Sequence, residues 1–531
     1  MTPLALGMLV LAALPRPRGP ADTVPLYDNL GDHHHEVSTA VPAAQRYFDQ
    51  GLRLVFGFNH GEAIRAFKEG ARLDPDCAMC FWGAALAYGP HVNAGMDSAS
   101  GIAAYAAAQQ ALRLAPLVSP REQAYIRAVA ERYAPVPTAL NRAALDSAYA
   151  RAMGEVVHNY PDDLDAATLY AEALMDLRPW NYWKRPSGEP YPGTLEIVSQ
   201  LERVLRENPN HPGACHYYIH ALEAVQPERA VACAERLAAL MPGEGHMVHM
   251  PAHIYIRVGR YADAIASNVH AVHTDEAYIE DQRPSGVYPL GYYPHNLHFL
   301  SFAATMAGQS ATAIDAARKL LAKTDLHAAA RFPFLQPYVS FLGLTLVTFG
   351  RWDDVLAEPL PPADLPYAVG LAHYARGVAF AATGKWADAQ GELDALTQVA
   401  AADSTDKTVF DVATQALRGE IAARHGQLDD AVTHFRAALA IEDTLSYSEP
   451  PTWYYPIRHS LGAVLLRAGR AAEAEQLYRE DLQRFPENGW ALFGLLAALR
   501  AERGTVDTDA VRTRFRTAWA TADVTLTASR F

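Results

Sequence analysis

The sequence predicts an all-α fold in which helical hairpins stack into a superhelical solenoid. A short bend built around a glycine recurs along the chain, as in "VGRYADAI" (258–265) and "FGRWDDVL" (349–356). Between these bends the apolar residues fall at i, i+3, i+4 and i+7, the spacing of a helix with one buried face. Because no part of the sequence alternates convincingly between apolar and polar residues, strands are not expected.

The first predicted hairpin spans residues 47–75, "YFDQGLRLVFGFNHGEAIRAFKEGARLDP". It carries Gly51, Ala63, Phe67 and Pro75, a pattern that resembles the tetratricopeptide repeat (TPR), a helix–turn–helix unit. The resemblance implies that the small residues let two helices touch and that the proline ends the second helix. The resemblance covers residues 44–500, with further bends at 307–314, 383–390, 425–432 and 468–475. It implies a solenoid in which each hairpin packs on its neighbours.

Three loops rich in Gly, Pro or aromatic residues interrupt the repeats, at 89–101, 178–194 and 280–294. Loops of this length in a compact array are usually functional, and their aromatic residues predict packed loops. The sequence therefore divides into a signal peptide (1–21), a histidine-containing segment (22–43), a His- and Cys-rich TPR-like half (44–330), and a regular TPR half with a C-terminal capping helix (331–531).

Composition and charge limit the classes of partner. The chain has 531 residues, of which 50% are hydrophobic and 20% charged, as in a well-packed protein. Its 45 basic and 59 acidic residues give a net charge of −14, and no Lys/Arg run occurs. No nucleic-acid partner is therefore expected. The apolar run Leu4–Leu14 is too short for a transmembrane span but fits an export signal, so we expect a periplasmic or secreted protein without a transmembrane span.

Histidines are concentrated in three successive predicted hairpins. Ten of the 21 histidines lie between residues 211 and 298. The TPR resemblance implies that first helices line a concave groove, chiefly through their second, fifth and ninth positions. His246, His249 and His253 take these positions when counted back from the bend at Gly259. Helix geometry returns offsets of 3 and 7 residues to within about 60° and 20° of the starting direction, so the three imidazoles share one face.

The flanking predicted helices add two more pairs, His216 with His220 on the preceding helix and His295 with His298 on the following one. His216 and His220 lie four residues apart in "HPGACHYYIHALEA", a spacing that lets two imidazoles converge on one metal ion. His249 and His253 repeat that spacing. We therefore predict a metal site on the groove, with these candidate ligands: His216, His220, His246, His249, His253, His295 and His298.

Pro251 lies within the predicted helix that carries three of these ligands. It cannot donate a hydrogen bond to the carbonyl of Met247, so the helix either kinks there or begins near His249. In the second case His246 belongs to the entering loop.

A second, weaker candidate cluster lies near the N-terminus. "GDHHHEVST" supplies His33, His34 and His35, and "CAMCFWG" supplies Cys77 and Cys80 at i and i+3 of a predicted helix. These five residues are candidate metal ligands. Two alternatives remain open, because the CxxC pair also fits a disulfide in an exported protein and the three histidines also fit a solvated loop.

Imidazole ligands suit zinc, copper, iron and nickel, and thioethers add a preference for Cu(I). Met247 and Met250 lie among the histidines, and carboxylates for an iron site are sparse, so we expect copper or zinc. The bound ion is either catalytic, with an activated water, or only stored or carried. The sequence contains no serine triad, P-loop or dinucleotide motif, so enzymatic activity is left undecided.

Beyond the repeat itself, the chain resembles a bacterial group of exported His-rich TPR proteins of no established activity. The shared blocks include "YFDQGLRLVFGFNH", "DPDCAMCFWG", "NHPGACHYYIHALEA", "HMVHMPAHIYIRVGRY" and "EPPTWYYPIRHSLGAVLLRAGR". The resemblance implies the architecture and names no reaction. Two other functions therefore stay open: a scaffold without metal that binds a protein or peptide in its groove, and a pH sensor based on clustered histidines.

Overall fold

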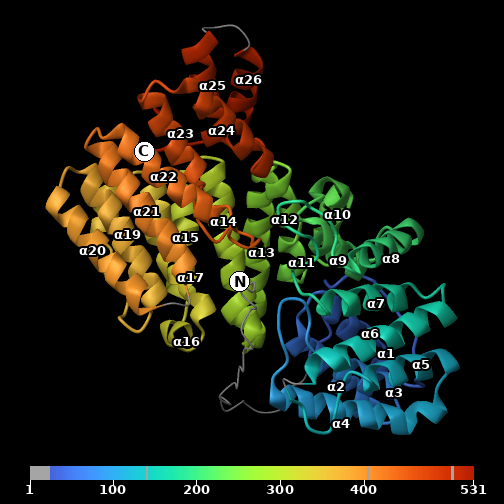
Figure 1. The fold of residues 1–531 in the computed structure, drawn as a ribbon. Coiled ribbons are helices and arrows are strands. Elements are labelled where there is room, and N and C mark those ends of the chain that lie inside the picture. The colour runs from blue at the N-terminus through green and yellow to red at the C-terminus, as the bar shows by residue number, and fades with distance from the viewer. Residues whose placement is uncertain (1–23, 139–140, 404–405, 504–507) are drawn as a thin grey trace. The chain divides into compact units, whose positions relative to one another are not determined.

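The computed structural model describes residues 24–138, 141–403, 406–503 and 508–531, and within these residues it contains helices and no β-strand (Figure 1). The predicted signal peptide (1–21) lies outside the described residues. The all-α prediction is confirmed. No helix within the described ranges is long and apolar enough to cross a membrane.

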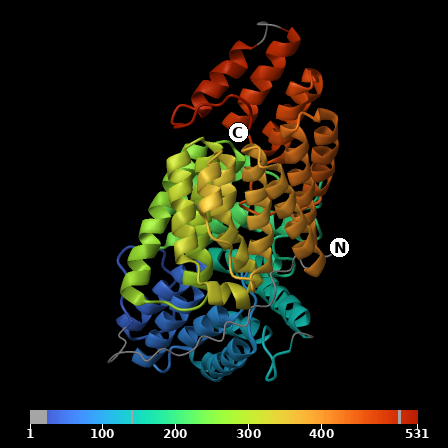
Figure 2. The same ribbon diagram turned by 90° about the vertical axis from the view of Figure 1, so that its left-hand side faces the viewer.

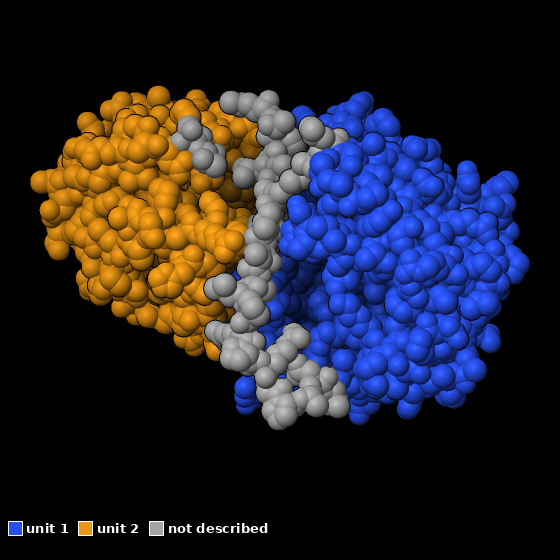
Figure 3. Space-filling model, turned by 90° about the horizontal axis from the view of Figure 1, so that it is seen from below, with its two compact units in different colours: residues 1–254, 270–293 blue, residues 255–269, 294–531 orange. Residues whose placement is uncertain are grey.

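The chain forms two compact units, which Figure 3 shows in different colours. Unit 1 contains residues 1–254 and 270–293, and unit 2 contains residues 255–269 and 294–531. The chain passes between the units within three helices, α12 (Pro251–Arg257), α13 (Tyr261–Gln282) and α14 (Tyr293–Met306).

Unit 1 is otherwise built from eleven α-helices within its described residues. These are α1 (Pro42–Phe56), α2 (His60–Leu73), α3 (Ala78–Tyr88), α4 (Ser98–Leu114), α5 (Pro120–Ala130), α6 (Arg142–Asn159), α7 (Leu164–Asp176), α8 (Thr194–Glu207), α9 (Pro212–Leu222), α10 (Val231–Leu240) and α11 (Gly245–His249). Single turns of other helical types occur at η1 (Ala115–Leu117), η2 (Pro227–Ala230) and η3 (Tyr288–Tyr292).

Unit 2 continues the same alternation of helix and bend. Its remaining helices are α15 (Ser310–Lys323), α16 (Leu326–Arg331), η4 (Pro333–Leu335), α17 (Gln336–Thr348), α18 (Trp352–Ala357), α19 (Pro366–Ala382), α20 (Trp386–Ala402), α21 (Lys407–Arg424), α22 (Leu428–Glu442), α23 (Ile457–Arg467), α24 (Ala471–Arg484), α25 (Gly489–Arg503) and α26 (Asp509–Ala518).

Successive helices pack as antiparallel hairpins, and the first helix of one hairpin also packs on the first helix of the next. α19 contacts both α20, its hairpin partner, and α21, the first helix of the following hairpin. The ribbon in Figure 2 shows these helices of unit 2 side by side. This is the nearest-neighbour packing of a TPR-like solenoid, as the repeat pattern predicts.

The recurring glycine of the bends has a conformational cause. Six bend glycines have positive φ values between 65° and 80°, the left-handed region that ends a helix without the strain of a Cβ atom: Gly259, Gly308, Gly350, Gly384, Gly426 and Gly469. Gly51 has a different role, since a Cβ atom there would lie 2.6 Å from the Phe67 ring. Its missing side chain lets α1 and α2 touch.

The helix around Pro251 is interrupted rather than continuous. α11 ends at His249 and α12 begins at Pro251, so that Met250 joins them. Pro251 occupies the first position of α12, where a missing N–H costs nothing. His246 lies on the short helix α11 and not in a loop, and this geometry turns its side chain toward α9.

Candidate metal centre

α9 carries two of the candidate ligands, His216 and His220, one helical turn apart. The helix starts at Pro212, and the Nδ1 atom of His211 caps it by accepting the Ala214 N–H at 3.2 Å. Every residue of α9 is buried. A helix that is buried all round places its histidines in the interior of unit 1, where water cannot satisfy them.

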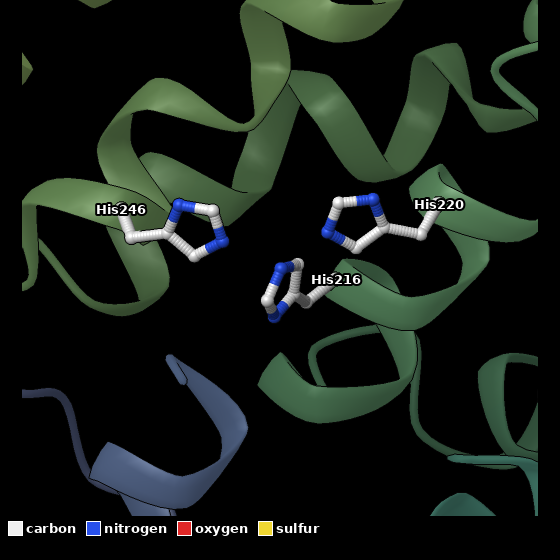
Figure 4. A group of neighbouring side chains, drawn as sticks. All are labelled: His216, His220 and His246. Carbon is white, nitrogen blue, oxygen red and sulfur yellow. The ribbon is translucent and has the colours of Figure 1, made fainter. Parts of the chain in front are cut away.

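His246, on α11, completes a group of three imidazoles. One nitrogen from each of His216, His220 and His246 lies within 4.8 Å of the other two. Figure 4 shows the three rings turned toward a common centre, two from α9 and one from α11. The three residues are 0%, 3% and 1% exposed. The sequence prediction that these histidines converge is therefore supported by the geometry of unit 1.

The tautomer of His216 follows from its contact with α1. Its Nδ1 lies 2.5 Å from the carbonyl oxygen of Phe56, which can only accept, so Nδ1 carries the proton. The neutral ring then has its lone pair on Nε2. Metal-binding histidines almost always hold their second nitrogen in this way, because the hydrogen bond fixes the ring orientation.

The nitrogens at the centre of the group are not satisfied by the protein. Among the residues that the structure describes, Nε2 of His216, Nε2 of His220 and both nitrogens of His246 have no hydrogen-bond partner. A buried polar atom without a partner costs free energy, and several in one place call for an explanation such as a bound ion.

Burial keeps these imidazoles neutral. Desolvation lowers the pKa of His216 and of His246 well below the usual value, and neighbouring histidines lower both further. Burial also lowers the pKa of His220, against the opposing effect of the Glu223 carboxylate. A neutral imidazole offers a lone pair, so protons do not compete for these nitrogens near pH 7.

The aromatic ring of Phe58 packs against all three histidines of the cluster. Its ring centroid lies 4.5 Å from that of His216 and 5.9 Å from those of His220 and His246. Phe58 has a positive φ of 57°, a backbone conformation that non-glycine residues rarely adopt. Strain of this kind persists only where the surroundings hold it, and here it directs the ring into the histidine cluster.

Two further histidines extend the same buried region. His91 stacks on Phe58 with centroids 4.4 Å apart, and His60 lies 4.4 Å from His91. Burial lowers the pKa of His60 to about 3 and that of His91 well below its usual value. His91 accepts the Asn93 N–H through Nδ1 at 3.3 Å, and the lowered pKa values keep both His60 and His91 neutral beside the cluster.

His249 and His253, on α11 and α12, flank the three imidazoles of this group. His253 Nδ1 pairs with Glu223 Oε2 at 2.8 Å, and its Nε2 lies 2.9 Å from Nε2 of His249. Burial would raise the pKa of Glu223, but His253 and His220 lower it. Glu223 therefore places a negative charge beside His220, 3.6 Å from its Nδ1.

Two of the loops predicted from the sequence contribute aromatic side chains that line the histidine cluster. Trp180, from the 178–194 loop, lies 5.1 Å from His220 between ring centroids, and Tyr292, from the 280–294 loop, lies 4.5 Å from His246. Trp180 and Tyr292 both belong to unit 1 and pack against the cluster.

His295 and His298 belong to unit 2. There the His298 ring packs edge-on against Phe341, with centroids 4.2 Å apart, and its burial lowers its pKa to about 3. The site described here is built from unit 1 alone, and the assignment of His295 and His298 to it stays a prediction.

The N-terminal histidines gather around a carboxylate that the sequence analysis did not identify. Asp165 Oδ1 lies 2.9 Å from His33 Nε2 and 3.1 Å from His211 Nε2, and its Oδ2 lies 2.7 Å from His35 Nδ1. His34 instead contacts Asp49 at 2.8 Å. Burial would raise the pKa of Asp165, but these histidines hold it well below its usual value.

The Asp165 group is geometrically able to hold an ion, yet its hydrogen bonds fit a network without one. His211 Nδ1 already accepts the Ala214 N–H, so the proton of its neutral ring is on Nε2 and points at Asp165. A protonated nitrogen cannot bind a metal. This group therefore ties residues 33–35 to α7 and α9.

Cys77 and Cys80 form a disulfide. This is the alternative that the sequence left open, and it corrects their assignment as metal ligands, because a disulfide sulfur is not a thiolate. The other cysteines, Cys215 and Cys233, are free and buried.

The comparisons with known proteins add little to this geometry. No family model matches the chain, and no curated protein matches it. The human IFIT1 dimer with m7Gppp-AAAA is similar at 12% identity over 91% of this chain and 92% of that chain, with a TM-score of 0.32. The structure of Naa15/Naa10 bound to HypK-THB is similar at 13% identity over 90% and 70%, with a TM-score of 0.22. TM-scores this low carry no argument, so the fold rests on the helices themselves.

Proposed function

We propose that the protein binds one transition-metal ion, zinc or copper, through His216, His220 and His246. The observation that carries the proposal is the group of buried, neutral imidazoles whose ligating atoms lie within 4.8 Å of one another. Their unsatisfied nitrogens supply the lone pairs, and the Phe56 carbonyl holds one ring in the tautomer that ligation needs.

The donor set suits the proposed metals. Imidazole nitrogens bind zinc at about 2.0–2.1 Å, so binding one ion would draw the three nitrogens closer together than the 4.8 Å within which they lie. Three protein ligands on a tetrahedral ion leave one position for water, the arrangement of catalytic zinc sites. The carboxylate of Glu223, beside His220, offsets part of the positive charge of a buried ion.

Two broader statements belong to the same proposal. The protein is a member of the exported His-rich TPR group, located in the periplasm or secreted. The Cys77–Cys80 disulfide supports this location, because such bonds persist in oxidising compartments and are rare in the cytosol. A binding scaffold without metal remains the alternative function for a solenoid of this kind.

Metal analysis of untagged protein tests the proposal. The protein would be purified without added metal or chelator, and its metals measured by inductively coupled plasma mass spectrometry. We expect about one equivalent of zinc or copper per chain. Protein stripped with a chelator should regain that equivalent when titrated with Zn²⁺ or Cu²⁺, and the ion found in the protein as purified identifies the metal, because Cu²⁺ binds imidazole sites more tightly than Zn²⁺ in any case.

A matched pair of variants locates the ion. In H216A/H246A the metal should be lost, whereas H270A/H273A should retain it, because His270 and His273 are exposed. Far-UV circular dichroism establishes that both variants are folded. Wild-type protein that contains less than a tenth of an equivalent, and that does not take up either ion after stripping, rules out the metal site and leaves the scaffold.

A further inference from the structure

Residues 526–531, "LTASRF", bend at residues 527–529 and lie against the face of unit 2 lined by α21, α23 and α25, which is here called the inner face. No helix includes them, although Leu526 and Ser529 are buried. The segment touches the first helices of several hairpins, which contact only their neighbours in a solenoid. It therefore occupies the position of a bound peptide rather than that of another repeat.

The main chain and the serine of this segment are held by specific hydrogen bonds. Ser529 Oγ donates to the carbonyl of His459 at 2.8 Å and lies 2.7 Å from the Tyr478 hydroxyl, and the Tyr455 hydroxyl donates to the Ser529 carbonyl. Ser529 is 1% exposed. The pocket around it has room for a small side chain only.

Arg530, the next residue, makes the ionic contact of the segment. The Arg530 guanidinium makes a bidentate ion pair with the Glu420 carboxylate of α21, and the two side chains are 12% and 5% exposed. A planar guanidinium matches a carboxylate in two parallel hydrogen bonds, which lysine cannot reproduce. Without this partner Glu420 would be a nearly buried, uncompensated charge on the inner face.

Phe531 completes the contact. Its carbonyl oxygen accepts a hydrogen bond from Arg424 at 2.8 Å, and its ring meets Trp490 edge-on with centroids 5.7 Å apart. A cavity of about 20 Å³ remains beside Arg530 and Phe531, next to Trp352 and Tyr374. The surface therefore binds a small residue, an arginine and an aromatic residue in succession.

We infer that this inner face of unit 2 is a docking site for a partner segment of the type small residue–Arg–aromatic, and that residues 526–531 occupy it in cis until such a partner displaces them. The inference is independent of the metal centre, which lies in unit 1. A tethered segment acts at an effective concentration on the order of millimolar, so a partner segment binds measurably only when it is abundant or when the tether is released.

A charge exchange tests the inference in the full-length chain. R530E repels the tethered segment from Glu420 and leaves the docking surface intact, whereas E420R repels it and reverses the charge of the surface. Two fluorescent peptides are used, TLTASRF, which copies residues 525–531, and TLTASEF. Their binding to each variant is measured by fluorescence anisotropy.

We expect R530E to bind TLTASRF and not TLTASEF, and E420R to bind TLTASEF and not TLTASRF. Wild-type protein should bind TLTASRF at least about tenfold more weakly than R530E does, because its own segment competes. A folded R530E variant that binds neither peptide, or binds both equally, overturns the inference.

Folding of the variants is checked by circular dichroism and thermal melting. If R530E is unfolded, S529W replaces it, since a tryptophan cannot fit between Tyr478 and the His459 main chain and displaces the segment without changing a charge. If both variants are unfolded, residues 526–531 are an obligatory part of the core and the inference is wrong.

Discussion

The carbonyl oxygen of Phe56 fixes the tautomer of His216, a residue 160 positions away in the sequence. The two nitrogens of this ring therefore have separate roles, since Nδ1 donates to α1 and Nε2 faces the other two imidazoles. The two roles can be separated by substitution, because the amide nitrogen of asparagine takes the place of Nδ1 and that of glutamine takes the place of Nε2.

We predict that H216N keeps the hydrogen bond to Phe56 and loses the metal. Its free energy of unfolding in chelator should stay within about 1 kcal/mol of wild type, whereas H216Q leaves the buried carbonyl unpaired and costs about 1–3 kcal/mol. Urea unfolding and metal analysis of both variants measure the two effects. A folded H216N with a full equivalent of metal would remove His216 from the ligand set.

His298, a half-buried histidine outside the three proposed ligands, predicts a loss of stability in acid. The folded-state pKa of His298 is lowered to about 3, whereas the unfolded value is near 6.5. Below pH 6.5 the unfolded chain binds a proton that the folded chain does not, so stability falls with falling pH by about 1.4 kcal/mol per unit for this residue. The loss continues down to the folded pKa.

Substituting His298 isolates this contribution. In H298F the aromatic contact with Phe341 is kept and the titrating group is removed, so the decline in the free energy of unfolding between pH 6.5 and 5 should be shallower than in wild type. H270F, at an exposed position, should follow the wild-type curve. Both are measured by urea unfolding at intervals of half a pH unit, and identical slopes for H298F and wild type would contradict the prediction.

Asp165 should be a major stabilising residue of unit 1. D165N replaces one acceptor oxygen by an NH₂ group, which then faces the N–H of a histidine ring. Because a buried ionic network loses several bonds at once, we expect a cost of about 3 kcal/mol or more, and faster proteolysis within residues 24–40. Metal content should be unchanged, and loss of metal without loss of stability would instead make Asp165 a ligand.

Removing the disulfide tests the corrected assignment of Cys77 and Cys80. The double variant C77A/C80A should bind the same equivalent of metal as wild type, because the paired sulfurs are not ligands. A lower melting temperature is expected from the loss of the covalent link. Loss of the metal together with a retained fold would restore the cysteines as candidate ligands.

The repeat pattern predicted the helices because it is local. A bend glycine reflects the φ value that its own turn requires, and the spacing of apolar residues reflects the buried face of a single helix. The structure has a glycine in the left-handed conformation at six of the predicted bends. The i, i+4 spacing of His216 and His220 is equally local, and the order of the hairpins placed His246 beside them.

The rest of the site depends on contacts between distant parts of the chain. Asp165 meets His33 across 132 residues, and no spacing rule links them. Phe58 reaches the cluster through a strained backbone that composition does not reveal. The TPR frame places His295 and His298 on the same groove, and because both residues belong to unit 2 this part of the ligand set stays a prediction.

Glu244 and Asp275 form a buried pair of carboxyl groups near the proposed metal centre. The Tyr288 hydroxyl lies 2.9 Å from Glu244 Oε1 and 2.7 Å from Asp275 Oδ1, and its single proton can satisfy only one of them. Burial, and then the charge of Asp275, raise the pKa of Glu244 to about 8. Glu244 is therefore protonated in the folded protein at pH 7 and ionised in the unfolded chain.

The sign of the pH effect follows from this difference. Between the unfolded value near 4.5 and about 8 the folded state holds a proton that the unfolded state has released, so the stabilisation is complete below pH 4.5 and is lost as pH rises toward 8. In E244Q a neutral amide replaces the protonated acid, so we expect a flatter stability curve between pH 5 and 8 and a more stable protein at pH 8.5. Urea unfolding at pH 5, 7 and 8.5 measures this. D263N, at an exposed position of α13, serves as the control. If the stability of E244Q varied with pH as that of wild type does, Glu244 would be ionised in the folded state.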